Sequence, residues 1–126
     1  MNGNRFLLDT NAIIRLLKGE LAHFNSEIQN AEWIGISIIS QIEFMAFSNL
    51  SNEDIQLFEK FASRIEVVGI NPNSDLLAII YNTRKQAVLK LPDAIIASTA
   101  IWKNAILISD DTHFSKQKGL KTLHPN

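Results

Sequence analysis

Short apolar runs alternate with stretches of helical periodicity from one end of this chain to the other, and few folds accommodate that order. Five runs predict strands, the last of them a short edge strand, at residues 5–9, 33–39, 65–70, 105–109 and 120–123. Helical spacing predicts helices at residues 12–17, 40–47, 55–62, 72–88, from 92 onward, and 112–117. Because alternating strands and helices form parallel sheets with right-handed crossovers, we expect an α/β fold whose mostly parallel sheet of four to five strands is covered on both faces.

Length and composition predict a single domain, residues 1–126, in the cytosol. The chain has 126 residues, of which 46% are hydrophobic, enough for one sizeable core and too few for two. No apolar run approaches the roughly 18 residues of a membrane span, and residues 1–5 lead directly into a strand without a signal-peptide pattern. Because the sequence has no cysteine and only scattered histidines, a metal would depend on oxygen or imidazole ligands.

Acidic residues recur at one kind of position, where a strand ends or a helix begins. They are Asp9, Glu43, Asp93 and the neighbours Asp110 and Asp111. The carboxyl ends of parallel strands meet at one rim of a sheet, and ligands bind at that rim where the strand order reverses. Carboxylates held within a few ångströms of one another repel, and a hard cation such as Mg²⁺ or Mn²⁺ offsets that repulsion. The pattern therefore indicates a metal site.

Each of these acids also has a purely structural explanation. Ser40 and Glu43 have the spacing of a capping box. Asp9 and Asp111 each precede a predicted helix and fit an N-cap. Asp93 lies in the first turn of a helix, where its charge offsets the helix dipole. That helix is apolar on nearly all sides, however, so we expect it to be buried, and a charge on it then needs a partner or a metal.

Four motifs in this order closely resemble those of the PIN-domain ribonucleases, and the resemblance spans almost the whole chain. The motifs are Asp9-Thr10-Asn11, Ser37-x-x-Ser40-x-x-Glu43, Asp93-Ala94-Ile95-Ile96-Ala97 and Leu107-Ile108-Ser109-Asp110-Asp111-Thr112-His113-Phe114. The compact length is similar to that of the VapC-type toxins of bacterial toxin–antitoxin pairs. The resemblance implies a three-layer α/β/α sandwich, RNA cleavage that depends on Mg²⁺ or Mn²⁺, homodimerisation and inhibition by a cognate antitoxin.

The resemblance also assigns roles to the acids. Asp9 and Asp93 match the principal metal ligands of the family, and Glu43 and Asp111 match the rest of its acidic cluster. These roles predict metal-assisted hydrolysis of an RNA phosphodiester bond, with Asp9 and Asp93 holding the cation. Glu43 or Asp111 would then position the attacking water or a second cation.

Polar neighbours of the acids match supporting residues of the same motifs. These are Thr10, Asn11 and Ser109. The fourth motif of the family usually reads Thr-x-Asp or Thr-x-Asn, so Ser109 is a departure from it and Asp111 is the better match. Asp110 stands directly beside Asp111, which leaves the identity of the fourth acid open between the two.

Two further classes of protein stay open. One is a catalytically silent PIN-fold module that acts only by binding partners. The other is a receiver-like phosphoacceptor domain, which also gathers acids around Mg²⁺ at strand ends. Such a domain has a lysine after its late strand, where this chain has Ser109-Asp110-Asp111.

RNA binding needs cations near the acids, although the net charge is only −1. Two basic groups flank the third and fourth motifs: Arg84, Lys85 and Lys90, and Lys116, Lys118 and Lys121. We expect His113 on an exposed helical turn rather than as a general acid. Apolar residues of the second quarter of the chain form core, and any exposed subset would offer a dimer seam or a groove for an antitoxin helix: Phe44, Met45, Phe47, Phe58 and Phe61.

Overall fold

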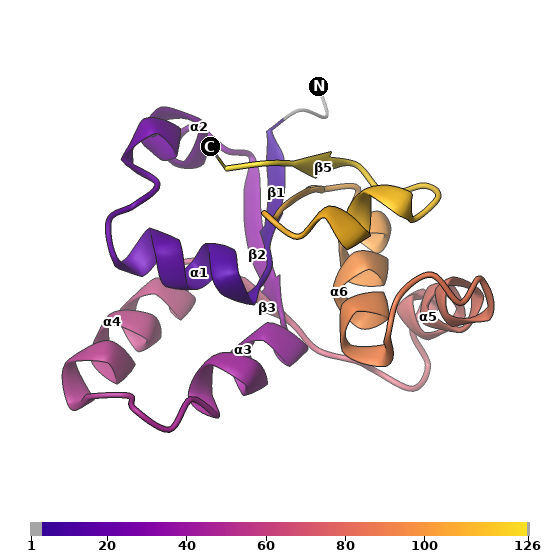
Figure 1. Cartoon of the computed structure of the whole chain (residues 1–126), viewed down its shortest axis with the longest axis horizontal. Coiled ribbons are helices and arrows are strands. Elements are labelled where there is room, and N and C mark those ends of the chain that lie inside the picture. Colours follow the sequence, from indigo (N-terminus) through magenta and orange to yellow (C-terminus); the bar gives the residue numbers. More distant parts are fainter. Residues whose placement is uncertain (1–3, 126) are drawn as a thin grey trace.

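Five parallel strands form the centre of the molecule, with helices on both sides of them (Figure 1). The computed structural model describes residues 4–125, so residues 1–3 and 126 of the predicted domain lie outside the described residues. The strands are β1 Arg5–Leu8, β2 Trp33–Ser37, β3 Glu66–Val68, β4 Ile106–Ile108 and β5 Thr122–Leu123. Across the sheet they follow the order β3-β2-β1-β4-β5. The predicted α/β class, the parallel sheet and its helical layers are confirmed.

Helices form a layer on each face of this sheet. One layer contains α1 (Thr10–Leu17), α2 (Asn25–Gln29), α3 (Ile38–Met45) and α4 (Asn52–Ala62), and the opposite side holds α5 (Asp75–Lys85) and α6 (Leu91–Trp102) (Figure 1). Two short 3-10 helices complete the described chain: η1 (Ala22–Phe24) and η2 (Thr112–Lys116). α6 contacts β1, β2 and β4, and α5 packs on α6. Within residues 4–125, no helix combines the length and the apolar character needed to cross a membrane.

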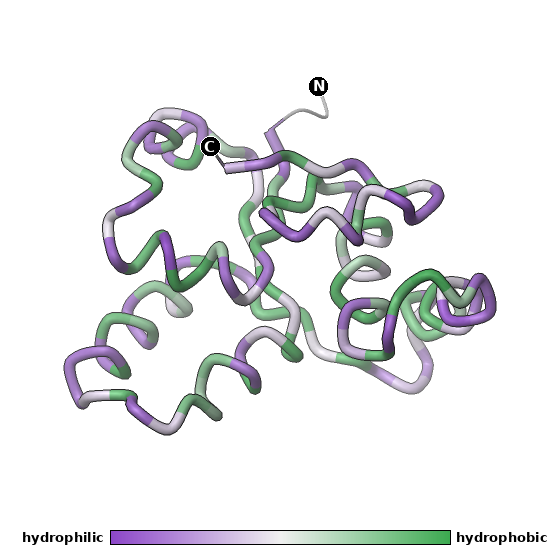
Figure 2. The backbone as a smooth tube through the Cα atoms, viewed as in Figure 1, coloured by the Kyte–Doolittle hydropathy of each residue, from purple (hydrophilic) through white to green (hydrophobic). Residues whose placement is uncertain are grey.

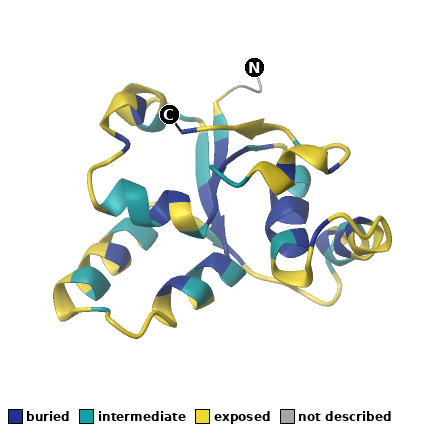
Figure 3. Ribbon diagram, in the orientation of Figure 1, coloured by how far each residue is buried: buried dark blue, intermediate teal, exposed yellow. Residues whose placement is uncertain are grey.

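The core is divided between the two faces of the sheet by the alternation of side chains along each strand. Leu7 of β1 and Leu107 of β4 pack with the small residues of α6. Phe6, Leu8 and Ile108 pack with α1, α3 and α4 on the other face. The central strands are therefore buried on both faces, as the continuous apolar runs predicted (Figures 2 and 3).

α6 is buried as predicted. Its residues from Ala94 to Ala100 are all buried, and Pro92 lies in its first turn, where a missing N–H leaves no unmet hydrogen bond. This helix is the one that brings Asp93 against the end of the sheet.

Several predicted helix boundaries are wrong; α4, for example, begins at Asn52 rather than at residue 55. α3 begins at Ile38 rather than Ser40, because the Ser37 hydroxyl accepts a hydrogen bond from the Ile39 N–H (3.1 Å) and caps the helix. α5 spans residues 75–85 rather than 72–88. At its start the Asn71 side chain accepts a hydrogen bond from the N–H of residue 73 (2.9 Å) and holds a turn, and past its end Ala87 adopts a left-handed φ of 59°.

Candidate functional site

The candidate site lies where the strand order reverses. β1 has β2 on one side and β4 on the other; the chain enters β2 directly after β1 and enters β4 only after β3. Asp9 directly follows β1, and its N–H donates a hydrogen bond to the carbonyl of Ile108 at the end of β4 (3.2 Å). Asp110 and Asp111 follow β4. The first and fourth motifs therefore meet at the carboxyl ends of adjacent strands, as expected for a binding crevice in a parallel sheet.

The structure brings all four predicted acids to one cavity at this point. The cavity has a volume of about 260 Å³ and is lined by Asp9, Thr10, Asn11, Glu43, Phe47, Asp93, Ile96, Asp111 and Phe114. Six of these nine residues were predicted from the sequence as site residues, and the apolar three were not. Phe47, Ile96 and Phe114 carry no polar group, so nothing in their chemistry marked them as neighbours of the acids.

Asp9 is the most buried of the four acids, with 5% of its surface exposed. It is also the N-cap of α1, where its Oδ1 accepts a hydrogen bond from the Ala12 N–H (2.8 Å). The pKa of Asp9 is raised to about 6, chiefly by burial and also by the nearby charges of Asp110 and Asp111, against hydrogen bonds from Ser109 and Ala12 that lower it. The capping explanation for Asp9 is confirmed, and the carboxylate nevertheless sits in surroundings that oppose its charge.

Glu43 enters the cavity from α3, and the predicted capping box with Ser40 is wrong. Ser40 lies inside the helix, is buried, and its hydroxyl has no hydrogen-bond partner among the described residues. The carboxylate of Glu43 instead accepts a hydrogen bond from the Thr10 hydroxyl at the start of α1 (2.5 Å). Thr10 therefore fixes one oxygen of Glu43 and leaves the other oxygen for the cavity.

Asp93 enters from the first turn of α6 and is half-buried. Burial raises its pKa, as do the charges of Asp111 and Glu43, whereas the charges of His113 and Lys90 lower it. The rise in pKa means that the folded protein disfavours the charged form of Asp93 unless a cation is near. If Asp93 only offset the helix dipole, the dipole would stabilise its charged form and its pKa would fall instead.

The structure separates the roles of Asp110 and Asp111. Asp111 lines the cavity, is the N-cap of η2, and accepts hydrogen bonds from the N–H of His113 (2.9 Å) and from its Nδ1 (2.8 Å), which lower the pKa of Asp111. Asp110 does not line the cavity, and its Oδ2 forms an ion pair with Nη1 of Arg15 on α1 (3.2 Å). The hydroxyl of Ser109 accepts the Asp111 N–H (3.0 Å) and also bonds to Asp9, so it links the two acids.

The donor set suits a hard cation that retains water. Within residues 4–125, no three acidic or histidine side chains already lie close enough to one another to hold a single metal ion. Mg²⁺ usually keeps several waters and takes one or two protein carboxylates, so close convergence of three side chains is not required. Four carboxylates around a cavity of about 260 Å³ leave room for a hydrated ion and provide only oxygen ligands.

Of the basic residues predicted to flank the acids, some lie beside them and others do not. Lys90 lines a second cavity that adjoins the first, together with His113, which is 74% exposed on η2 as predicted. Lys118 and Lys121 line other cavities, and Arg84 donates a hydrogen bond to the carbonyl of Leu89 (2.7 Å). The two basic groups therefore do not gather around the acids as sets.

Fold and site together define a class of protein, a parallel α/β domain with an acidic cavity at the carboxyl ends of its strands. The sequence profile of the PIN domain matches residues 6–120, so the chain belongs to the PIN domain family. The family predicted from the four motifs is confirmed. A search of curated proteins found no match.

Solved structures of similar fold come from toxin–antitoxin complexes. A toxin–antitoxin complex from Klebsiella pneumoniae contains a chain that is 26% identical, with a TM-score of 0.75, over 95% of this chain and 97% of that one. VapBC-1 from nontypeable Haemophilus influenzae is also 26% identical, with a TM-score of 0.74, over 96% and 98%. VapBC2 from Rickettsia felis, bound to a DNA fragment from its promoter, is 20% identical with a TM-score of 0.78, over 94% and 97%. The predicted likeness to VapC-type toxins is thus confirmed at the level of the fold.

Proposed function

We propose that this PIN-domain protein is a metal-dependent ribonuclease that hydrolyses RNA phosphodiester bonds and serves as the toxin of a toxin–antitoxin pair. The observation that carries the proposal is the cavity at the strand-order reversal, which four carboxylates from four separate parts of the chain line together. The raised pKa values of Asp9 and Asp93 support it, because burial and the neighbouring acids outweigh the groups of the protein that stabilise the two charged forms. Capping accounts for Asp9 and Asp111 but not for Glu43.

Asp9 and Asp93 are the proposed holders of the cation, and Glu43 and Asp111 complete the site. When bound, Mg²⁺ or Mn²⁺ would offset the carboxylate charges and polarise the phosphate. The chain itself orients the acids: Ser109 bonds to Asp9, and the Thr10 hydroxyl holds one oxygen of Glu43. The second oxygen of Glu43 is then free to accept a hydrogen bond from the water that attacks phosphorus.

The sequence of bond changes is that of simple hydrolysis. The water oxygen attacks phosphorus and gives up a proton to the Glu43 carboxylate, the bond from phosphorus to the leaving ribose oxygen breaks, and that oxygen takes up a proton from solvent. Phe47, Ile96 and Phe114 border the acids with apolar surface, which limits the water around the reacting phosphate.

Cleavage of RNA by the purified, partner-free protein tests the proposal. Structured and unstructured RNAs are incubated with EDTA, Mg²⁺ or Mn²⁺, and the Asp9→Asn variant is run beside the unchanged protein to exclude a contaminating nuclease. Asp75→Asn is a matched control, because Asp75 is exposed in the first turn of α5 and lines none of the acidic cavity. Cutting that needs the metal and Asp9 but not Asp75 supports the ribonuclease. Metal binding with no cutting of any RNA favours the alternative of a silent binding module.

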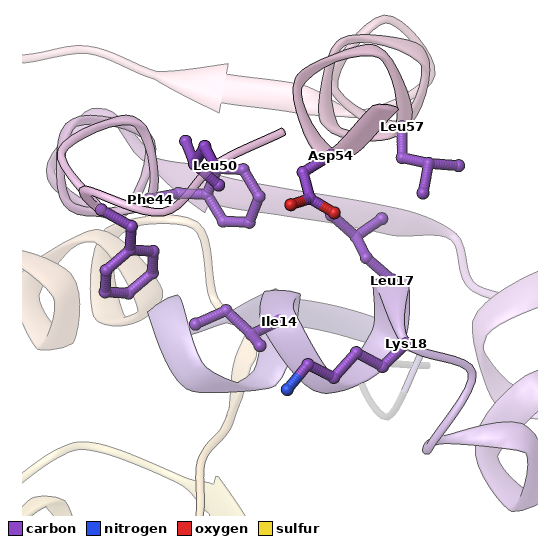
Figure 4. A pocket seen from close by; sticks show the side chains of 8 residues that line it. Ile14, Leu17, Lys18, Phe44, Leu50, Asp54 and Leu57 are labelled. Atoms are coloured by element: carbon purple, nitrogen blue, oxygen red, sulfur yellow. The ribbon is translucent and has the colours of Figure 1, made fainter. Parts of the chain in front are cut away.

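The proposed antitoxin contact is an apolar groove of about 170 Å³ next to the acidic cavity (Figure 4). Side chains of α1 form one wall, and side chains of α3, the loop after it and α4 form the other: Ile14, Leu17, Lys18, Phe44, Phe47, Leu50, Asp54 and Leu57. Phe47 lines both the groove and the acidic cavity, so a helix seated in the groove would end beside the acids. The similar structures of toxin–antitoxin complexes support this partner.

Leu57→Glu tests the groove. Leu57 is 42% exposed, so the change should leave the fold and RNA cleavage intact while it abolishes inhibition by the cognate antitoxin. Ile70→Glu, at an equally exposed apolar residue outside the groove, is the control and should stay inhibited. Inhibition of Leu57→Glu at unchanged antitoxin concentration would place the antitoxin elsewhere.

The family resemblance also supports a homodimer. Large apolar side chains remain exposed on α5, on α6 and in the turn between them: Tyr81, Val88 and Leu91. Sedimentation equilibrium of the partner-free protein tests this state. A dimer at micromolar concentration supports the proposal, and a monomer over the whole concentration range contradicts it.

A further inference from the structure

A second cavity of about 350 Å³ lies beside the acidic one and shares two of its carboxylates. Asp93 and Asp111 line both cavities, so they separate the two spaces. The remaining walls of the second cavity come from the turn between α5 and α6 and from η2: Val88, Leu89, Lys90 and His113. An RNA strand that passes the two shared carboxylates therefore enters the second cavity next.

The two cavities differ in charge. Of the described residues that line the acidic cavity, none is basic, whereas Lys90 and His113 line the second cavity. The charges of both residues reach Asp93, since both act on its ionisation. A phosphate is repelled by four carboxylates and attracted by the Lys90 ammonium, so the second cavity offers the polyanion favourable charge.

The second cavity also offers surface that suits a nucleobase. Its volume is near the lower end of the roughly 300–1,000 Å³ of small-ligand pockets. Val88 is 41% exposed and presents apolar surface, and the imidazole of His113 is a flat ring on the opposite element. Unpaired bases bind proteins by stacking on such rings and by apolar contact.

Hydrogen bonds hold the backbone around Lys90, and Lys90 itself is exposed. Nη1 of Arg84 donates to the carbonyl of Leu89 (2.7 Å), and the carbonyl of Lys90 accepts the Ala94 N–H in the first turn of α6 (2.8 Å). These bonds hold the backbone of Lys90 beside the cavity that this residue lines, and Lys90 is exposed to a ligand there. A site on a fixed backbone loses less entropy when it binds.

We propose that this second cavity binds the nucleotide next to the scissile phosphate, with Lys90 contacting a backbone phosphate. The inference rests on the proposed ribonuclease function and names a residue that holds the substrate at the same site.

The test measures cleavage and binding separately in four proteins: unchanged, Lys90→Ala, Lys90→Arg and Lys60→Ala. Lys60 is exposed on α4 and lines neither cavity, so it controls for the loss of one surface charge. KM and kcat are measured with an unstructured RNA oligonucleotide that the unchanged protein cuts. Binding is measured by fluorescence anisotropy with a 2′-O-methyl RNA oligonucleotide, which reports affinity without turnover.

Lys90→Ala should raise KM and the anisotropy Kd by about five- to ten-fold with kcat within two-fold, and Lys90→Arg should restore most of the affinity. The salt dependence of binding should fall by about 0.7 in log–log slope, the value for one phosphate contact on a single strand. Lys60→Ala should match the unchanged protein.

Equal KM and Kd for Lys90→Ala and Lys60→Ala would overturn the subsite, while cleavage by the unchanged protein would still uphold the ribonuclease. Lys90-dependent binding without cleavage would uphold the subsite and overturn the ribonuclease, and neither binding nor cleavage would overturn both.

Discussion

Replacing Asp9 by asparagine should stabilise the metal-free protein at neutral pH, although it removes a proposed metal ligand. Burial raises the pKa of Asp9 from its ordinary value of 3.8 to about 6. At about 1.36 kcal/mol per pKa unit, keeping this buried group ionised costs the folded state about 3 kcal/mol. Asparagine removes the charge but keeps an oxygen that accepts the Ala12 N–H, and it caps helices as well as aspartate does.

The pH dependence has a definite sign. The unfolded chain releases the Asp9 proton near the ordinary pKa of 3.8, and the folded chain releases it near 6, so the folded state holds the extra proton between these values. The stability that this proton contributes is complete below about pH 4 and is lost as the pH rises through about 6. Above that pH the unchanged protein carries the full cost of the buried charge, and Asp9→Asn does not.

Urea unfolding in EDTA near pH 4 and near pH 8 measures this difference. Between the two conditions the free energy of unfolding of Asp9→Asn, relative to the unchanged protein, should rise by about 3 kcal/mol. Asp75→Asn, at an exposed first-turn aspartate, should show no such rise. A relative stability of Asp9→Asn that stays constant or falls with pH would refute the argument that Asp9 is an uncompensated buried acid.

Three further changes test neighbouring parts of the site. Asp93→Asn should abolish metal-dependent cleavage and leave the metal-free protein at least as stable, whereas a loss of about 1 kcal/mol in urea unfolding would make Asp93 a helix-terminus charge only. Thr10→Val removes the hydroxyl bonded to Glu43 at constant shape and should slow single-turnover cleavage about ten-fold; an unchanged rate would show that this bond does not orient the carboxylate. Asp110→Asn should keep kcat within about three-fold, because Asp110 does not line the cavity. It should reduce stability by about 1 kcal/mol or less, because the ion pair of Asp110 with Arg15 is partly exposed.

The strands and most helices could be predicted because burial on both faces imposes continuous apolar runs that stand out in the sequence. The start of α3 could not, because Ile38 and Ile39 continue the β-branched run of β2 and only the side-chain cap of Ser37 ends the strand before them. η1 and α2, within residues 22–29, were not predicted, since their short sequence lacks a sustained apolar period.

That four acids meet at one cavity could be predicted because chain order and parallel topology place the ends of β1 and β4 and the starts of α3 and α6 together. The choice between Asp110 and Asp111 could not be predicted. It depends on the ion pair of Asp110 with Arg15, which lies 95 positions away in the sequence. The cavity at Lys90 could not be predicted either. The residues that line it from Val88 onward follow a left-handed turn at Ala87, and alanine is not a residue that predicts such a turn. That residues 1–126 form one domain stays a prediction.

Crystals of the partner-free protein soaked in MnCl₂ show whether the four carboxylates form a cation site. Anomalous scattering locates Mn²⁺ without reference to activity. We expect a peak in the acidic cavity within coordination distance of Asp9 and Asp93, and its loss in crystals of Asp9→Asn but not of Asp75→Asn. A cavity without a peak at saturating Mn²⁺, or peaks only at surface carboxylates elsewhere, would contradict this expectation.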